Sequence, residues 1–190
     1  MTRGEFTELL STKGYSYEIE GDKIVVTYNE GWVNLNSLKT LPSHIEFRNS
    51  GDINLESLEI LPSCVEFRNG GYVDLGALET LPLDVKFSNR GGVYLTELQT
   101  IHSGMKFNNS GYVDLGALET LPSDVEFNNG DFVNLRSLKT ISSGVEFNNS
   151  GYVNLKKLID DRFNKWPGNI ESIGSNRLLN SMIKRSLFSV

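Results

Sequence analysis

The sequence is poor in the residues that build most catalytic, cross-linked and metal sites. Among 190 residues there are one cysteine, Cys64, and two histidines. One cysteine excludes an internal disulfide and suits a reducing cytoplasm, where we predict the protein resides. The usual signatures of nucleotide, metalloprotease and serine-hydrolase sites are missing. We therefore predict a non-enzymatic protein with no cofactor, no metal and no catalytic residue.

Long apolar runs and an excess of positive charge are also missing. The N-terminal segment lacks the apolar run of a secretory signal, and nowhere do apolar residues extend far enough to span a membrane. The formal net charge is −6, which argues against direct binding to nucleic acid or to an anionic membrane, because phosphate contacts require Lys and Arg. Only the segment 156–190 is basic, and a solvated helical cap explains it most simply.

What the sequence does contain is a repeat of twenty residues that starts at Gly31. Two segments forty residues apart, 71–82 and 111–122, are identical. The common pattern is G-x-V-x-L-x-x-L-x-x-L-P-x-x-V-x-F-x-N-x, and its apolar columns begin at Val33, Leu35, Leu38, Leu41, Ile45 and Phe47. Alternation around V-x-L and V-x-F predicts two short strands per repeat, joined at corners.

Such repeats cannot bury their apolar edges alone, so they must stack. The fold class we predict is mainly β, a right-handed solenoid of six to seven coils over residues 31–158 and roughly 30 Å long. Stepping back one period places Val25, Thr27 and Asn29 in register with the first repeat. At Gly51 and its equivalents we expect a corner that uses positive φ.

A column of asparagines runs through the repeats: Asn49, Asn69, Asn89, Asn109, Asn129 and Asn149. A buried amide can bond to the backbone of its own turn and to the next asparagine, and so satisfy polar groups at a tight corner. We interpret this column as a structural ladder and not as a polar active site.

The phrase L-x-x-L-P-x-x-V-x-F-x-N resembles the short, twenty-residue leucine-rich repeats of bacterial proteins. That resemblance implies a parallel sheet lining one face and protein recognition as the usual role. This chain departs from the family pattern because Phe47 and Asn49 are two residues apart and a second V-x-L follows. A curved horseshoe and a straighter two- or three-sided β-solenoid (β-helix) therefore both remain open.

Both ends of a solenoid need caps that cover the terminal strands. Residues 1–30 predict a helix and a hairpin, since Thr2 and Glu5 have the spacing of a capping box and Gly21-Asp22 suits a turn. Residues 159–190 lose the repeat and predict a basic helical cap. We treat the three parts as one domain.

One set of residues has the composition of a cysteine nucleophile site. His44, Cys64 and Asp84 occupy the same repeat position and should be vertical neighbours about 5 Å apart. The position is a variable turn, however, and nothing supplies an oxyanion hole. We therefore assign it neither catalysis nor metal binding, because a structural zinc would need four ligands.

The outward columns beside the V-x-L strand predict a binding surface. They form a strip in which aromatic rings alternate with amides and carboxylates. The residues we assign to binding are Trp32, Tyr72, Tyr94, Tyr112, Phe132, Tyr152, Asp74 and Asp114. The alternative is a structural role, in which the aromatic residues are present because they favour β-strands or because a loop covers them.

A second outward column is charged and reads Glu46, Glu66, Lys86, Lys106, Glu126 and Glu146. Arg48 and Arg68 are placed to offset the first two glutamates diagonally, whereas Glu126 and Glu146 lack such partners. We interpret this face as one that keeps the protein soluble.

These observations favour a protein–protein interaction module that binds through the aromatic strip, as a monomer or homodimer, to a protein the sequence does not name. Three alternatives stay open, and one of them, a cysteine-dependent enzyme, would need His44, Cys64 and Asp84 to converge. An inhibitor of a nucleic-acid enzyme, of the kind phage and bacterial genomes encode, would use acidic surface to occupy a basic cleft. A carbohydrate binder would stack sugars on the tyrosines.

Overall fold

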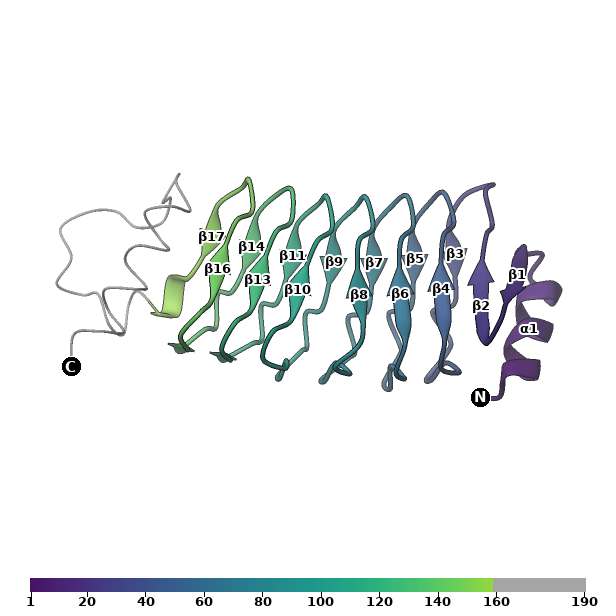
Figure 1. The fold of residues 1–190 in the computed structure, drawn as a ribbon, viewed down its shortest axis with the longest axis horizontal. Helices are drawn as coiled ribbons and strands as arrows, with labels where there is room; N and C mark the ends of the chain where they lie inside the picture. Colours follow the sequence, from purple (N-terminus) through teal and green to yellow (C-terminus); the bar gives the residue numbers. More distant parts are fainter. Residues whose placement is uncertain (159–190) are drawn as a thin grey trace, which may run out of the picture.

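The structure, a computed structural model, describes residues 1–158 as a straight row of stacked coils (Figure 1). We number the coils by the repeat, so that coil 1 comprises residues 31–50 and coil 7 starts at residue 151. Coils 1 to 6 each contribute one strand to each of two long parallel ladders, and the described part of coil 7 adds one strand to the second. A third, shorter ladder closes the section, and the solenoid is therefore three-sided rather than a horseshoe.

The two long sheets contain all but two of the described strands. Sheet A contains β1 (Tyr17–Glu20), β2 (Lys23–Val26), β4 (Ile45–Phe47), β6 (Val65–Phe67), β8 (Lys86–Phe87), β10 (Lys106–Phe107), β13 (Glu126–Phe127) and β16 (Glu146–Phe147). Sheet B contains β3 (Val33–Asn34), β5 (Ile53–Asn54), β7 (Val73–Asp74), β9 (Val93–Tyr94), β11 (Val113–Asp114), β14 (Val133–Asn134) and β17 (Val153–Asn154). On the third side β12 (Thr120–Leu121) pairs with β15 (Thr140–Ile141).

The register follows the repeat within the coils and breaks once before them. Val33 pairs with Ile53, and Phe47 with Phe67, at a constant offset of one period. In the hairpin, however, Ile24 pairs with Ile45 and Val26 with Phe47. The predicted register of Val25, Thr27 and Asn29 is therefore wrong by one residue.

The centre of the rod contains a continuous stack of phenylalanines. The stack comprises Phe47, Phe67, Phe87, Phe107, Phe127 and Phe147, all essentially buried. Neighbouring centroids are 5.1 to 5.7 Å apart, and the ring planes differ by at most 12°. Because each ring contacts the rings of both neighbouring coils, the stack links the repeats into one core.

The asparagine ladder bonds to backbone, as predicted, but from Asn49 to Asn129 the side-chain oxygens accept no hydrogen bond, so these asparagines are not bonded to one another. The Nδ2 of Asn89 donates to the carbonyl of Gly71 in its own coil at 3.0 Å, and to those of Gly91 and Gly92 at the start of the next coil at 3.0 and 3.2 Å. Its Oδ1 is buried without a donor. The same three carbonyls also accept backbone N–H groups, so the amide adds a second donor to each and ties neighbouring coils together at the corner.

The corner glycines are required by close approach and not by positive φ, which corrects the prediction. A Cβ on Gly91 would lie 2.4 Å from the backbone nitrogen of Tyr72 in the preceding coil. Of this column only Gly31 has a positive φ, of 143°. The left-handed conformation occurs instead at the turn before sheet A, at Cys64 (φ 58°) and Gly104 (φ 73°).

The N-terminal cap begins with α1 (Arg3–Thr12). The predicted capping box is present: the Glu5 backbone N–H donates to the Thr2 hydroxyl, and Glu5 accepts from the Thr2 N–H. Phe6 and Leu10 are buried against the first coils, and the β1–β2 hairpin turns at the predicted Gly21. The predicted C-terminal cap, 159–190, lies outside the described residues.

Candidate binding face

Five of the predicted strip residues form one unbroken row on the outer side of sheet B. Tyr72 meets Tyr94 edge to face, with centroids 5.6 Å apart, and Tyr94 meets Tyr112 in the same manner at 4.8 Å. Tyr112, Phe132 and Tyr152 then stack in parallel, at 5.1 and 5.3 Å. We call these five residues the aromatic strip. Trp32 lies on the same sheet but is separated from the strip by Asp52.

The edge-to-face packing of Tyr94 in the strip depends on Gly92. Gly92 occupies the column position that is aromatic in coils 3 and 5, and a Cβ there would lie 2.7 Å from the ring of Tyr112. Tyr112 therefore leans over Gly92, and Tyr94 enters from the adjacent column to fill the row. This coupling between neighbouring columns makes the strip continuous across a coil that lacks the usual ring.

The strip is partly open to solvent. Tyr152 is 50% exposed and Trp32 53% exposed, while the inner rings are half-buried against each other. The parallel rings are spaced like the coils, so their faces are turned towards neighbouring coils and their edges point outward. The Tyr112 hydroxyl is buried without a hydrogen-bond partner.

Asp74 and Asp114 lie beside the strip and shape the backbone after their strands. Each accepts a hydrogen bond from the backbone N–H two residues on, Gly76 at 3.0 Å and Gly116 at 2.9 Å. Asn54 does the same in coil 2, so neither bond requires a charge. Burial, only partly offset by the Gly76 bond, and the charge of Glu56 raise the pKa of Asp74.

Sequence reasoning missed a hollow of about 370 Å³ next to Asp74. Its floor is Gly76, Tyr94 forms a wall, and Glu56, Asp74 and Glu97 supply carboxylates. In the described part of the chain these three make no ion pair. The signal that could have revealed it is a glycine in an outward column with acidic residues in the coils on both sides.

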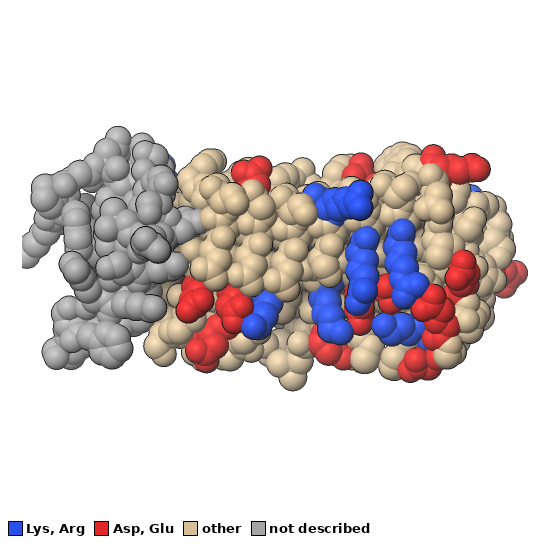
Figure 2. Space-filling model, turned by 45° about the horizontal axis from the view of Figure 1, so that its top comes forward, with Lys and Arg blue, Asp and Glu red and all other residues tan. Residues whose placement is uncertain are grey.

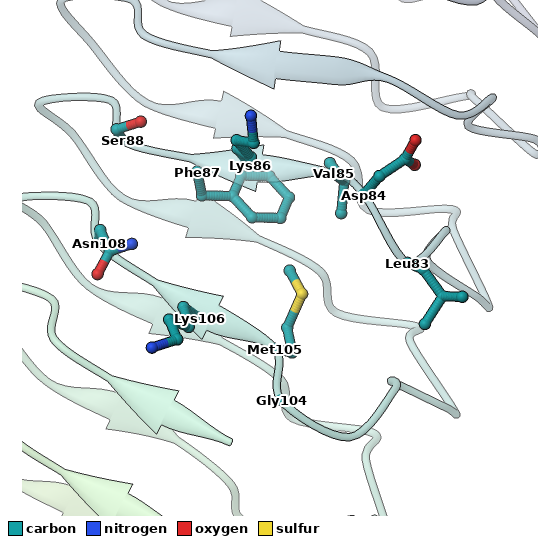
Figure 3. A pocket seen from close by; sticks show the side chains of 10 residues that line it. All are labelled: Leu83, Asp84, Val85, Lys86, Phe87, Ser88, Gly104, Met105, Lys106 and Asn108. Atoms are coloured by element: carbon teal, nitrogen blue, oxygen red, sulfur yellow. The ribbon is translucent and has the colours of Figure 1, made fainter. Parts of the chain in front are cut away.

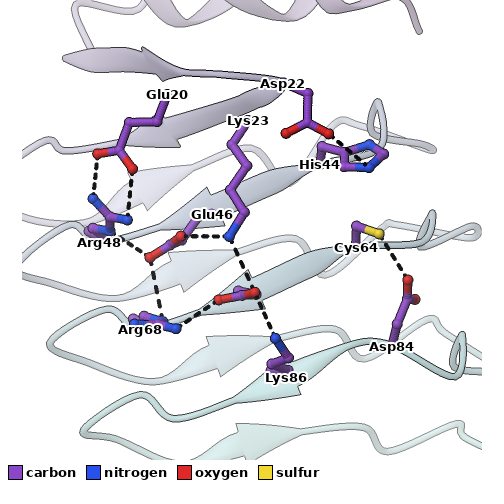
Figure 4. A network of polar contacts seen from close by, with 11 residues as sticks. Glu20, Asp22, Lys23, His44, Glu46, Arg48, Cys64, Arg68, Asp84 and Lys86 are labelled. Carbon is purple, nitrogen blue, oxygen red and sulfur yellow. Dashed lines mark hydrogen bonds and ion pairs between the residues drawn. The ribbon is translucent and has the colours of Figure 1, made fainter.

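Sheet A has a paired charge network (Figures 2 and 4). Lys23 lies 3.2 Å from buried Glu46 and 3.3 Å from Glu66, and Arg68 reaches both glutamates. Burial alone would raise the pKa of Glu66, but hydrogen bonds from Lys86 and Lys23 outweigh it and lower that pKa to about 2. These charged groups form ion pairs with one another, so few of them could also bind a charged ligand.

Lysines of neighbouring coils on sheet A turn away from each other. Lys86 pairs with Glu66 at 2.9 Å and Lys106 with Glu126 at 2.7 Å. The expectation that Glu126 lacks a partner is therefore wrong. Divergence of the like charges leaves a hollow of about 290 Å³ over Phe87 and Met105 (Figure 3). Both lysines are therefore paired, and the carboxylate that lines the same hollow, Asp84, accepts a hydrogen bond from the Cys64 thiol.

The turn containing His44, Cys64 and Asp84 has two separate contacts (Figure 4). The Cys64 thiol donates to Asp84 at 3.0 Å, and His44 lies 3.3 Å from Asp22. The hydrogen bond to Asp84 raises the pKa of Cys64, which keeps the thiol protonated and is the opposite of what a nucleophile needs. The left-handed φ at His44 and Cys64 gives this column a backbone role.

Comparison with known proteins gives no family, since we found no match to a family model, a curated protein or a solved structure. Among residues 1–158, no three His, Cys, Asp or Glu side chains are grouped to hold a metal ion. In the same part of the chain no helix is long and apolar enough to cross a membrane.

Proposed function

We propose that the chain is a non-enzymatic binding module that recognises another protein through the aromatic strip. The observation that carries the proposal is the unbroken, partly exposed row of five rings on sheet B. Tyrosines bury large area at small entropic cost, and they are held here on a rigid scaffold. The resemblance to leucine-rich repeats and the expected right-handed coil are part of the same proposal.

The ring orientation favours a protein over a sugar. A sugar stacks on a ring face, whereas Tyr112, Phe132 and Tyr152 turn their edges outward because they stack on each other. Ring edges carry partial positive charge and pack well against apolar side chains, carbonyls and other rings. Such groups are what a protein surface offers.

The test is photo-crosslinking from the strip in a lysate of the native cell. Benzoylphenylalanine at Phe132 should trap a defined protein, identified by mass spectrometry, while the same probe at exposed Ser88, beyond sheet A, should not. The triple variant Tyr72→Ala, Tyr112→Ala, Tyr152→Ala should lose the protein. Gly92 shows that the sheet accepts a position without a ring.

A matched control exists on the other sheet. Asn108, Asn128 and Asn148 form an exposed column in three successive coils, linked by side-chain hydrogen bonds of 3.0 Å. Their triple alanine variant should keep the captured protein. Capture that survives in the folded tyrosine variant, checked by circular dichroism, would show that the strip is not the binding face.

A further inference from the structure

The charges that flank the aromatic strip are segregated along the rod. Acidic residues lie in coils 2 to 4, at Glu56, Asp74 and Glu97, and basic residues in coils 6 and 7, at Arg136 and Lys156. All but half-buried Asp74 are exposed, and within residues 1–158 none of the five makes a salt bridge. These unpaired charges are therefore acidic towards one end of the face and basic towards the other, while Asp114 of coil 5 and Asp131 of coil 6 accept hydrogen bonds from their own surroundings.

The uncharged rings occupy the middle of this pattern. Tyr94 belongs to coil 4 and Tyr112 to coil 5, with Tyr72 and Phe132 one coil further out on either side. A two-fold axis between β9 and β11 would place coil 3 of one molecule opposite coil 6 of another, and coil 2 opposite coil 7. Every acidic coil except coil 4 would then face a basic one, and rings would face rings.

The chain itself shows what can cover the segment around Gly76. Its identical copy lies around Gly116, where the Nε of Arg136 is 3.2 Å from the place a Cβ would occupy. At the first copy Thr96 stands in the position of Arg136, and the hollow with its three carboxylates stays open. A guanidinium thus packs against this segment where one is present, and the open copy lacks one.

We propose that the aromatic strip binds a second copy of the chain in antiparallel orientation, with Arg136 of the partner subunit facing Asp74 and Lys156 of the partner subunit facing Glu56. This inference rests on the proposed function and names the partner of the same surface. A parallel arrangement would set like charges opposite each other, which is unfavourable. An isologous contact also closes after two copies and forms no fibre.

The size of the face sets the strength of the dimer. Seven coils spaced about 4.8 Å apart, with this side of each coil about five residues wide, bury on the order of 1,000 Å² in total when paired. That area is at the small end for a specific complex, so the dimer should be weak and sensitive to salt. Measurements must therefore cover high protein concentration and low ionic strength.

The experiment is sedimentation equilibrium of the full chain with complementary charge reversals. Wild type should show a concentration-dependent dimer that weakens with salt. The variant Glu56→Lys should dimerise far more weakly, and so should Lys156→Glu, because each sets like charges opposite each other across the contact. An equimolar mixture of the two variants should restore a dimer. The off-face control Ser88→Lys should behave as wild type.

Each result decides between the partners. A wild type that stays monomeric at low salt, or a mixture that fails to associate while both variants are folded, overturns the second-copy proposal. The protein-binding function would still stand if the crosslinker at Phe132 trapped a different protein. A dimer that survives both reversals would place the contact elsewhere and likewise overturn the proposal.

Discussion

At the scale of single residues, the described charges divide into two chemical situations. Glu66 is buried and surrounded by three cations, whereas Asp74 is half-buried beside other carboxylates with no cation. The pKa of the first is lowered and that of the second raised. Their stability contributions should therefore respond to pH in opposite directions.

Asp74→Asn should stabilise the fold at neutral pH. Because the folded pKa of Asp74 is raised, its ionised form is penalised in the fold, and stability falls as pH rises through that range. Asparagine can still accept the Gly76 hydrogen bond, as Asn54 does for its own coil. We expect a gain of roughly 0.5–1 kcal/mol in urea unfolding at pH 7, kept small by solvent screening.

The identical sequence around position 114 supplies the control for that variant. Asp114 accepts hydrogen bonds from the Gly116 backbone N–H and from the Asn134 side-chain amide, both at 2.9 Å. Asp114→Asn should change stability by less than Asp74→Asn. Equal gains from the two variants would show that Glu56 and burial do not single out Asp74.

Glu66→Gln should remove part of the acid sensitivity of the protein. The pKa of Glu66 is about 2 in the fold, below its unfolded value, so its stabilisation is complete above about pH 4.5 and is lost as pH falls towards 2. The variant should cost about 2 kcal/mol at pH 7 and show a flatter stability profile below pH 4.5. A parallel pair of profiles would contradict the assigned network.

At the scale of elements, the sequence predicts the coils better than the register in which the N-terminal hairpin pairs with the first coil. The apolar columns, the asparagine column and the capping box predicted the ladders and α1, because each alternation has a single buried face. The hairpin register failed because Ile24, Val25 and Val26 are all apolar and all buried, so alternation does not distinguish one register from the next.

Part of the candidate site could likewise be predicted from the sequence, and part could not. The strip could be predicted because its rings recur in outward columns of one repeat. The hollow at Gly76 could not, since it depends on which side chain of coil 4 stands over a glycine of coil 3. Glu56 and Glu97 are ordinary exposed residues within their own coils, and only stacking brings them together.

Asn89→Ala should destabilise far more than an exposed asparagine does. The buried side chain donates to three carbonyls in two coils, and each such hydrogen bond contributes about 0.5–1.5 kcal/mol. We expect a loss of about 3 kcal/mol or more in urea unfolding. Asn89→Asp should be equally harmful at pH 7, because a carboxylate cannot donate to carbonyls, and Asn108→Ala should be nearly neutral.

At the scale of the whole molecule, the solenoid should behave as a row of interchangeable units. Neighbouring coils contact each other through the phenylalanine stack and the asparagine ladder, and the same contacts recur every twenty residues. Stability in such a fold approximates a sum over coils and their interfaces. The identical segments at 71–82 and 111–122 allow this to be tested without an artificial junction.

Deleting residues 73–112 joins Tyr72 to Val113 and leaves the sequence GYVDLGALETLP intact. Two whole coils are lost, the register of every column is kept, and the end coils keep their neighbours. The shortened protein should fold cooperatively, with a urea m-value lower by roughly a quarter because less surface is buried. Deleting residues 73–102 instead shifts the following coils by half a period, sets apolar columns against polar ones, and should prevent folding. If the forty-residue deletion also failed to fold, the coil containing Gly92 and Tyr94 would be an essential centre of the rod and the coils would not be interchangeable.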